Sequence, residues 1–327
     1  MRAAWYADFG AAKDVLEIGE QDAPSAGGGQ VLVRVHASGI NPLDVKRRDG
    51  ERGPMIGERM IPHFDGAGVI EAVGDGVDPG RVGERVWLYE GHWKRGDGTA
   101  AEYIVLDSSR ANPLPERHSF AEGACLGIPA MTAHPLVFTD GPVDGQTILV
   151  TGAAGAVGNY AVQMARNGGA KVIGTVSSDE KAARAAEDGA THTINYKTED
   201  VADRVMELTA GRGVDRVVEV ELGGNIETTV KVLKTGGVIA AYASMAQPVV
   251  PFSFYGFLMK SPTLRIIGCF TMPTDFKMHS VADISRWMNE GRLTSRVAAE
   301  FPLDGIAAAH EMVEAGRQVG GVVVTID

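Results

Sequence analysis

The chain has 327 residues, of which 44% are hydrophobic and 22% are charged, and its formal net charge is −11. This length suggests two domains or one large one, and the composition is ordinary for a globular protein. The acidic balance argues against nucleic acid and against an anionic membrane as partner. Two cysteines exclude a disulfide framework and fit a reducing compartment. No signal segment or run of about 18 apolar residues is seen, so a cytoplasmic enzyme is expected.

The first 115 residues are predicted to be rich in β-strands. Apolar and polar residues alternate over Val31–His36 after a glycine-rich turn. Short strands separated by Gly and Pro indicate a compact, partly open barrel. Pro113–Pro115 resembles a crossover to a second domain. Further strands are expected over 66–73, 85–89 and 101–106, and helices over 120–126 and 132–138, the second disturbed by Pro135.

A strand–turn–helix–strand unit occupies residues 147–178. A buried strand over 147–150 enters a turn of small residues, and a helix over 159–167 and a strand over 171–176 follow. In this context a glycine-rich turn binds a dinucleotide, because bare N–H groups at the helix N-terminus approach the pyrophosphate. Ala153 replaces the first glycine of the usual G-x-G-x-x-G, and the alternative is a tight turn without ligand. The predicted cofactor-binding residues are Gly152, Ala153, Ala154, Gly155, Ala156, Val157 and Gly158.

The end of the second strand indicates which dinucleotide binds. An NAD site usually has Asp or Glu there, whereas this strand ends at Val176 and continues with Ser177, Ser178 and Lys181. A ribose 2′-phosphate would meet two hydroxyls and a cation, so we predict NADPH. The alternative is a capping box formed by Ser177 and Glu180, with Lys181 solvated. Both can hold, because a capped helix N-terminus also binds anions.

Strands and helices alternate up to about residue 268. The helix over 179–188 ends at Gly189, a good C-terminal signal. Repeated βα units predict an α/β fold with a doubly wound parallel sheet. The tail is expected to fold back onto the first domain. The remaining predictions are strands over 191–195, 214–220, 237–243, 264–269 and 321–326, and helices over 199–209, 225–234, 274–289 and 303–315.

Six motifs occur in order: SGINPLDVKRRDG, DGAGVIEAVG, GERVW, GTAAEYIV, PAMTAH and TGAAGAVG. Together they resemble the zinc-independent, zeta-crystallin-like quinone oxidoreductases of the medium-chain dehydrogenase/reductase superfamily, over essentially the whole chain. The resemblance implies a GroES-like β-barrel catalytic domain over 1–120 and 270–327 and a Rossmann NADPH-binding domain over 121–269. It also implies an active site in the cleft and a homodimer paired through the strand near 264–270.

The resemblance also bears on metal binding. In zinc-dependent relatives the three ligand positions match Asn41, the pair Phe64–Asp65, and a site near Ile128. A catalytic zinc needs three Cys, His or carboxylate ligands, and these positions replace a lost ligand poorly. His63 and Asp65 are the two nearby residues whose side chains are candidates for residual zinc ligands. We therefore expect no bound metal.

The resemblance assigns two catalytic residues. The Asn41 amide is placed to donate to a developing oxyanion, and the alternative is that Asn41 only shapes the turn before Pro42. Thr132 matches a threonine near the nicotinamide, and the alternative is a helix N-cap. Asp44 matches a family aspartate and is interpreted as structural.

Other residues are carried over to the cofactor. Tyr196 matches a tyrosine beside the adenosine phosphate, Ser244 follows a strand end, and Phe270 and Thr271 border the nicotinamide. Cys269 is interpreted as an inert apolar residue.

Some residues depart from the family pattern. Lys46–Arg48 replaces a stretch that often carries tyrosine, and it is interpreted as a solvated face or as an anion site. His63, His92 and His134 are candidate proton donors or structural hydrogen-bonders.

The predicted function is an NADPH-dependent, metal-independent reductase that transfers hydride to a small-molecule acceptor, a quinone or an α,β-unsaturated carbonyl. The alternatives are an alcohol or aldehyde oxidoreductase, or a non-catalytic NADPH-binding sensor, because a fold does not determine a function.

Overall fold

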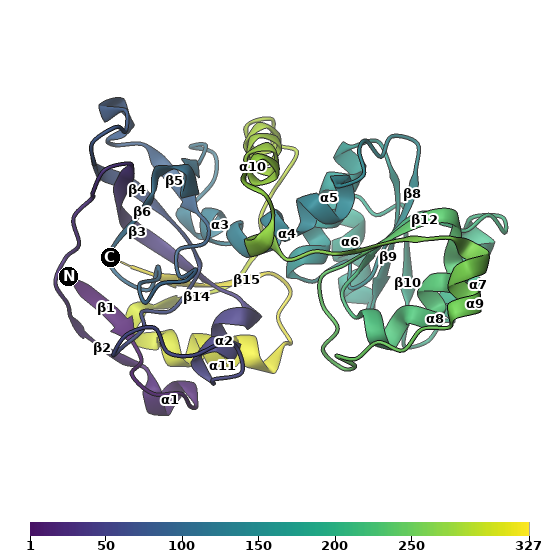
Figure 1. Cartoon of the computed structure of the whole chain (residues 1–327), viewed down its shortest axis with the longest axis horizontal. Coiled ribbons are helices and arrows are strands. Elements are labelled where there is room, and N and C mark those ends of the chain that lie inside the picture. The colour runs from purple at the N-terminus through teal and green to yellow at the C-terminus, as the bar shows by residue number, and fades with distance from the viewer. Residues whose placement is uncertain (327) are drawn as a thin grey trace. The chain divides into compact units, whose positions relative to one another are not determined.

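The computed structural model describes residues 1–326. It divides into two compact units, one formed by Met1–Ile128 with the tail from Val281, the other by Pro129–Ser280. Figure 1 labels the elements of both units. Within residues 1–326, no helix is both long enough and apolar enough to cross a membrane.

The first unit, here called the barrel unit, is built around the long strand β3 (Gln30–Ile40). β4 (Asp65–Val73) pairs with one edge of β3, and β6 (Tyr103–Asp107) and β15 (Gly321–Thr325) share the other edge. The tail therefore supplies a strand to this sheet. The unit also contains β1 (Arg2–Trp5), β2 (Glu17–Glu20), β5 (Arg85–Leu88), β7 (Ala111–Pro113), β14 (Val297–Pro302), α1 (Ala12–Val15), α2 (Pro42–Arg48), α3 (Phe120–Ala124) and α11 (Ile306–Ala315).

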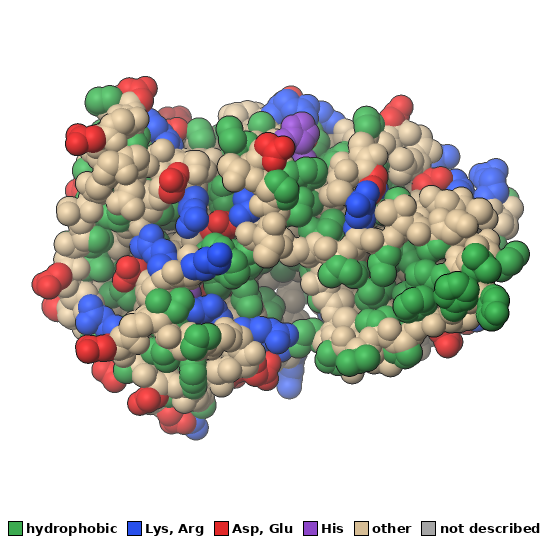
Figure 2. All heavy atoms as spheres, in the orientation of Figure 1, with side chains coloured by type: hydrophobic (Ala, Val, Ile, Leu, Met, Phe, Trp, Pro, Cys, Tyr) green, Lys and Arg blue, Asp and Glu red, His purple; other side chains and the backbone are tan. Residues whose placement is uncertain are grey.

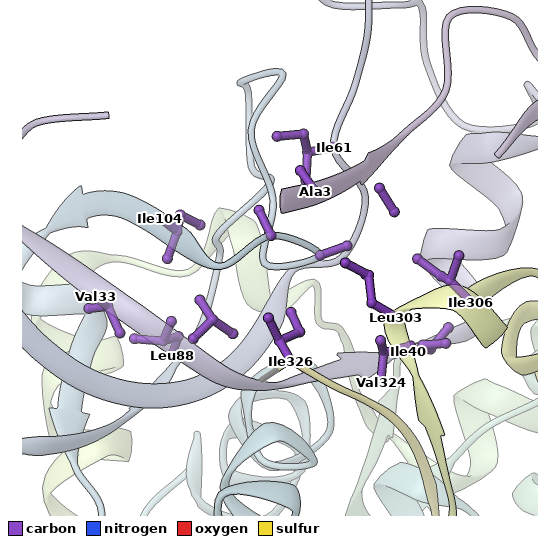
Figure 3. Close-up of a cluster of buried hydrophobic side chains, with 14 of the residues drawn as sticks. Ala3, Val33, Ile40, Ile61, Leu88, Ile104, Leu303, Ile306, Val324 and Ile326 are labelled. Atoms are coloured by element: carbon purple, nitrogen blue, oxygen red, sulfur yellow. The ribbon is translucent and has the colours of Figure 1, made fainter. Parts of the chain in front are cut away.

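One hydrophobic core holds the barrel unit together. Ile40 of β3 lies beside Leu303 and Val324 of the tail, as Figure 3 shows. Chain segments almost 300 residues apart thus bury the same apolar surface, which is the main stabilising contribution to such a unit. Gly39 permits the close approach of α3, because a Cβ there would lie 1.9 Å from the Ala124 carbonyl oxygen.

The second unit, here called the Rossmann unit, contains a six-stranded parallel sheet in the order β10-β9-β8-β11-β12-β13. The strand order reverses between β8 and β11, and ligands of such sheets bind at the carboxyl ends of the strands there. The strands are β8 (Thr147–Val150), β9 (Lys171–Val176), β10 (His192–Asn195), β11 (Val214–Glu219), β12 (Leu233–Ala241) and β13 (Thr263–Ile266). The helices are α5 (Ala156–Asn167), α6 (Asp179–Asp188), α7 (Val201–Leu208), α8 (Leu222–Val232) and α9 (Phe254–Lys260).

Two further helices, α4 (Gly127–Phe138) and α10 (Thr274–Asn289), run through the unit boundaries. The predicted α/β fold class with a parallel sheet is confirmed. Helix α4 continues through Pro135. The residue ranges predicted for β8, β9, α6 and α10 agree with the structure, whereas β12 starts and ends earlier than predicted. The short strands β1, β2, β7 and β14 and helix α9 were not predicted, because their segments are too short for a clear periodicity.

Candidate active site

The turn after β8 has the geometry of a dinucleotide-binding turn. Gly152 adopts φ +63, and Gly155 is the N-cap of α5 without a side chain to bond its N–H groups. A Cβ on Gly158 would lie 2.2 Å from the Gly152 carbonyl oxygen, so glycine is required there. The Ala153 methyl fits because β9 carries Gly174 opposite, where a Cβ would approach it to 2.7 Å. The residues of this turn therefore fit a pyrophosphate.

A cavity of about 500 Å³ opens at the carboxyl ends of β8, β9, β10 and β11. This volume is within the range of small-molecule sites. Two predicted cofactor residues line it, Gly152 and the half-exposed Tyr196. The full lining is Leu149, Thr151, Gly152, Thr175, Tyr196, Glu199, Asp200, Val201, Val220, Glu221, Asn225, Thr228 and Thr229.

The buried Glu219 holds the lining of this cavity. Its Oε1 accepts hydrogen bonds from Thr151 Oγ1 at 2.8 Å, Glu221 N at 2.8 Å and Asn225 Nδ2 at 2.9 Å, and its Oε2 accepts from Thr229 Oγ1 at 3.0 Å. All four donors belong to lining residues. The sequence analysis missed Glu219, although an acidic residue inside the apolar run of β11 was a usable signal.

The loop after β12 is fixed by Glu221 and Ser244. Burial would raise the pKa of Glu221, but donors including the backbone N–H groups of Ala246 and Met245 lower it below the usual value. Ser244 Oγ accepts from Gly223 N at 2.9 Å and donates to the Gln247 carbonyl at 2.6 Å. The predicted cofactor residue Ser244 therefore has a structural role in this state. Phe270 and Thr271 form a short 3₁₀ turn after β13, which ends earlier than predicted.

The strand end predicted to bind the 2′-phosphate needs one correction. The N-cap of α6 is Ser178, whose Oγ accepts from Lys181 N at 3.3 Å. The capping box of Ser177 and Glu180 is wrong by one residue, because Ser178 is still extended, with φ −164 and ψ 163. Ser177 and the Lys181 side chain are half-buried beside this cap.

In the barrel unit, Asn41 is the N-cap of α2 and is only 5% exposed. Its backbone N–H donates to Asp44 Oδ2 at 2.7 Å, and its side-chain Nδ2 donates to Asp65 Oδ2 at 2.7 Å. Asn41 thus shapes the turn before Pro42 and also holds a side-chain contact. The Asn41 side chain also takes part in a capping box with Asp44.

Asp65 is completely buried and poorly compensated. Its Oδ2 also accepts from Ile128 N at 2.8 Å, while Oδ1 has no partner within residues 1–326. Burial raises the pKa of Asp65 well above its usual range, and the neighbouring Asp44 raises it further. Burial also raises the pKa of Asp44, to about 7. Both shifts favour the uncharged form of Asp65.

The positions that match zinc ligands do not fit a catalytic zinc. The Asn41 amide donates a hydrogen bond, and the Phe64 and Ile128 side chains have no ligand atoms. The one carboxylate, Asp65, has two N–H donors on Oδ2. A catalytic zinc needs three deprotonated ligands, so this donor set does not supply a site.

The cationic run of α2 is largely structural. Arg48 is 2% exposed and its Nη2 lies 2.6 Å from Glu314, while Lys46 pairs with Glu51 at 3.0 Å. The Arg47 guanidinium lies 6.0 Å from the centre of the Phe64 ring. The interpretation of a solvated face is therefore wrong for Arg48, because the sequence does not show that α11 supplies Glu314.

The three candidate histidines are all buried. His92 Nδ1 lies 2.5 Å from the Ile61 carbonyl, and burial lowers the pKa of His92 to about 3. Burial also lowers the pKa of His63 well below its usual value. Both rings are therefore neutral at pH 7 and supply no imidazolium. His134 Nδ1 lies 2.9 Å from Ser280 Oγ.

Thr132 lies inside α4, five residues after the helix begins at Gly127, and is 5% exposed. The alternative that it caps a helix is therefore wrong. Its role at a nicotinamide, like those of Phe270 and Thr271, stays a prediction.

Two family models match the chain. Residues 27–116 match the alcohol dehydrogenase GroES-like domain, and residues 156–285 match the model of zinc-binding dehydrogenases. A 2-haloacrylate reductase of Burkholderia sp is 34% identical over 312 residues, which cover 92% of each chain. A quinone oxidoreductase of Pseudomonas aeruginosa is 31% identical over 317 residues, which cover 95% of each chain.

Solved structures agree with these relatives. A structure described as an NAD-dependent alcohol dehydrogenase superposes with a TM-score of 0.90 at 29% identity, and all of both chains is covered. A mycobacterial protein solved in complex with NADPH gives a TM-score of 0.86 at 28% identity, again over all of both chains.

Proposed function

The chain belongs to the quinone oxidoreductase-like branch of the medium-chain dehydrogenase/reductase superfamily, and from this premise we propose an NADPH-dependent, metal-independent reductase that transfers hydride to a quinone or an α,β-unsaturated carbonyl. An oxidoreductase with a nicotinamide cofactor follows from the family. The observation that carries the finer proposal is the contact of the Asn41 amide with Asp65, at a position where zinc-dependent relatives are expected to hold metal.

Residues of the Rossmann unit would hold the cofactor. NADPH, when bound, supplies the hydride. The N–H groups at the start of α5 bind the pyrophosphate, because Gly155 offers them no side-chain acceptor. Ser177, Ser178 and Lys181 bind the 2′-phosphate, the serines by hydrogen bonds and the lysine by charge.

Residues of the barrel unit would act on the acceptor. Asp65 Oδ2 accepts from Asn41 Nδ2, which fixes the orientation of the amide whose N–H groups would stabilise a developing oxyanion. The raised pKa of Asp65 favours its uncharged form, which would not oppose this oxyanion. Solvent would supply the proton that converts the enolate to the saturated carbonyl compound, or the quinolate to the quinol. Thr132 is proposed as a second residue at the nicotinamide.

We also propose a homodimer formed at β13. This strand ends the parallel sheet and all four of its residues are exposed. An unpaired strand edge is a template for pairing with a second chain. Figure 2 shows apolar side chains gathered over the Rossmann unit. The exposed apolar residues of α9 and β13 are Phe254, Tyr255, Leu258, Met259, Leu264 and Ile266. A monomer in sedimentation equilibrium would remove this part of the proposal.

An alcohol oxidoreductase is the second candidate, since a structure described as an alcohol dehydrogenase is as similar as the quinone oxidoreductases. The two differ in metal dependence and acceptor. Full quinone reduction in the presence of a chelator supports the proposal, whereas activity with alcohols that a chelator abolishes supports the second candidate.

The direct test is Asn41→Ala, assayed with NADPH and a small quinone. Removing one oxyanion donor is expected to lower kcat by about 100-fold. The affinity for NADPH should be unchanged, because the proposed cofactor residues lie on other elements. Asn289→Ala, at an exposed asparagine, is the matched control. Unchanged kcat in Asn41→Ala would contradict the assigned role.

A further inference from the structure

Four buried side chains of the barrel unit form one continuous line of hydrogen bonds, here called the histidine chain. His310 Nε2 lies 2.9 Å from His63 Nε2, and His63 Nδ1 lies 2.7 Å from Ser38 Oγ. Ser38 Oγ lies 2.7 Å from Thr99 Oγ1, which in turn lies 2.6 Å from the main-chain oxygen of Asp65. All four side chains belong to residues with 0% exposure, so water does not compete for these bonds.

The final acceptor sets the direction of every bond. A carbonyl oxygen can only accept a hydrogen bond, so the Thr99 hydroxyl donates its one proton to the main-chain oxygen of Asp65. Thr99 Oγ1 must then accept its second hydrogen bond from the Ser38 hydroxyl. Ser38 then has no proton left for His63, so His63 Nδ1 must carry a proton and donate it.

The same logic continues to the far end of the chain. Burial lowers the pKa of His63 well below its usual value, and the ring is neutral. A neutral ring with a proton on Nδ1 has a bare Nε2, so His310 donates from its own Nε2. His310 Nδ1 then carries a lone pair, and it has no partner among residues 1–326.

We propose that the histidine chain runs in one direction, from His310 to Asp65, and that it positions Asp65 and, through it, the Asn41 amide. The tautomers are part of the proposal: His63 is protonated on Nδ1 and His310 on Nε2. The catalytic consequence rests on the proposed function, whereas the tautomers do not.

The backbone of His63 supports a role beyond filling space. His63 adopts φ +78, in the left-handed region that a bulky residue rarely occupies. Such strain persists only where surrounding contacts determine the conformation. Here both ring nitrogens are bonded, and Asp65 follows only two residues later.

The surroundings of the far end keep His310 uncharged. Burial and then the charge of Arg48 lower the pKa of His310 to about 3. His310 is therefore a neutral ring with one N–H, as the direction of the chain requires. Arg48 is itself held by Glu314, one turn after His310 on α11. His92, the other group acting on His63, also lowers the pKa of that ring.

The first test is ¹⁵N NMR of the full-length protein labelled on histidine. Long-range ¹H–¹⁵N spectra distinguish the two neutral tautomers, and His63→Gly and His310→Asn assign the signals. Glycine suits φ +78, so the first variant also removes the backbone strain. The expected result is Nδ1–H for His63 and Nε2–H for His310. An Nε2–H tautomer of His63 in the wild type overturns the proposal.

The second test is Thr99→Val, which removes the last hydroxyl at nearly constant size. Without that acceptor the Ser38 proton is free to turn to His63, so the Nε2–H tautomer of His63 is expected to become populated. A histidine spectrum identical to the wild type overturns the proposal. Thr139→Val is the matched control, since Thr139 Oγ1 also donates to a carbonyl, that of Pro135 at 2.6 Å, on another element.

Kinetics of the same variants test the positioning role. Thr99→Val is expected to lower kcat with a small quinone about tenfold, because small misplacements of a catalytic group are costly, and to leave KM for NADPH unchanged. Predicted tautomers with an unchanged kcat overturn the positioning role. A wild-type protein without quinone activity refutes the proposed function instead, and the NMR result still decides the direction of the chain.

Discussion

Two buried carboxylates differ sharply in how the protein compensates them. Glu219 of the Rossmann unit and Asp65 of the barrel unit are both 0% exposed. Glu219 accepts four hydrogen bonds over both oxygens, whereas Asp65 accepts two, both on Oδ2. Burial removes water from both side chains, but only Glu219 has donors on both of its oxygens in place of that water.

The two carboxylates therefore have different roles: Glu219 holds the structure together, and Asp65 responds to its surroundings. A carboxylate with four donors ties together β8, β11 and α8 around the cavity. A carboxylate with a raised pKa and one unbonded oxygen is sensitive to pH and to its neighbours. The comparison therefore assigns a structural role to Glu219 and is in keeping with the role proposed for Asn41 beside Asp65.

The largest effect is expected for Glu219→Leu. Four donors would lose their acceptor, so the free energy of unfolding should fall by about 3–5 kcal/mol. Urea unfolding followed by circular dichroism measures this. Glu219→Gln keeps the shape and one oxygen, and it should lose clearly less. Equal unfolding midpoints for wild type and Glu219→Leu would contradict the structural role assigned to the hydrogen bonds of Glu219.

The buried base His92 should make the free energy of unfolding depend on pH, with an effect of intermediate size. The pKa of His92 falls to about 3 in the folded protein, so the unfolded chain binds more protons between that value and the ordinary His pKa near 6.5. Stability from this group is present at neutral pH and is lost as pH falls. His92→Asn should therefore flatten the decline in stability between pH 7 and 4 by about 2 kcal/mol. An unchanged slope contradicts the assigned cause.

The smallest effect is expected for Asp65→Asn. The amide keeps the shape of the side chain and one acceptor oxygen for the two N–H donors, so the loss at pH 6 should be about 1 kcal/mol. Because the folded pKa of Asp65 is raised, its contribution is fully present below the unfolded pKa and is lost as pH rises. The deficit of the variant should therefore shrink from pH 5 to pH 8. A deficit that stays constant from pH 5 to pH 8 would show that Asp65 is already ionised when folded.

The sequence predicted what local patterns determine. The ends of α6 were readable because Gly189 stops the helix in the left-handed conformation, with φ +113. The glycine-rich turn was readable because its residues are adjacent. The sequence analysis named Asp65 only as a residual zinc ligand. Its hydrogen bond to Asn41 was not predicted, because it joins segments 24 residues apart. Glu219 was missed because its donors include Thr151, 68 residues away in sequence, and three residues at and beyond the start of α8.

The same limit explains the errors. The choice between Ser177 and Ser178 as N-cap depends on one pair of backbone dihedrals, which composition does not determine. Arg48 looked solvated because Glu314 is 266 residues away in sequence. Local signals therefore predicted most of the elements and the glycine-rich turn, whereas the charges and pKa shifts of the candidate site depend on tertiary contacts.

The most direct measurement is a titration with NADPH and NADH, followed by nicotinamide fluorescence, for wild type, Lys181→Ala and the control Lys171→Ala. Lys171 is exposed at the start of β9, away from the strand end. We expect tighter binding of NADPH, a preference reduced about tenfold in Lys181→Ala, equivalent to about 1.4 kcal/mol, and no change in the control. Equal affinity of the wild type for NADH would contradict the 2′-phosphate site, and binding of neither would contradict the reductase itself.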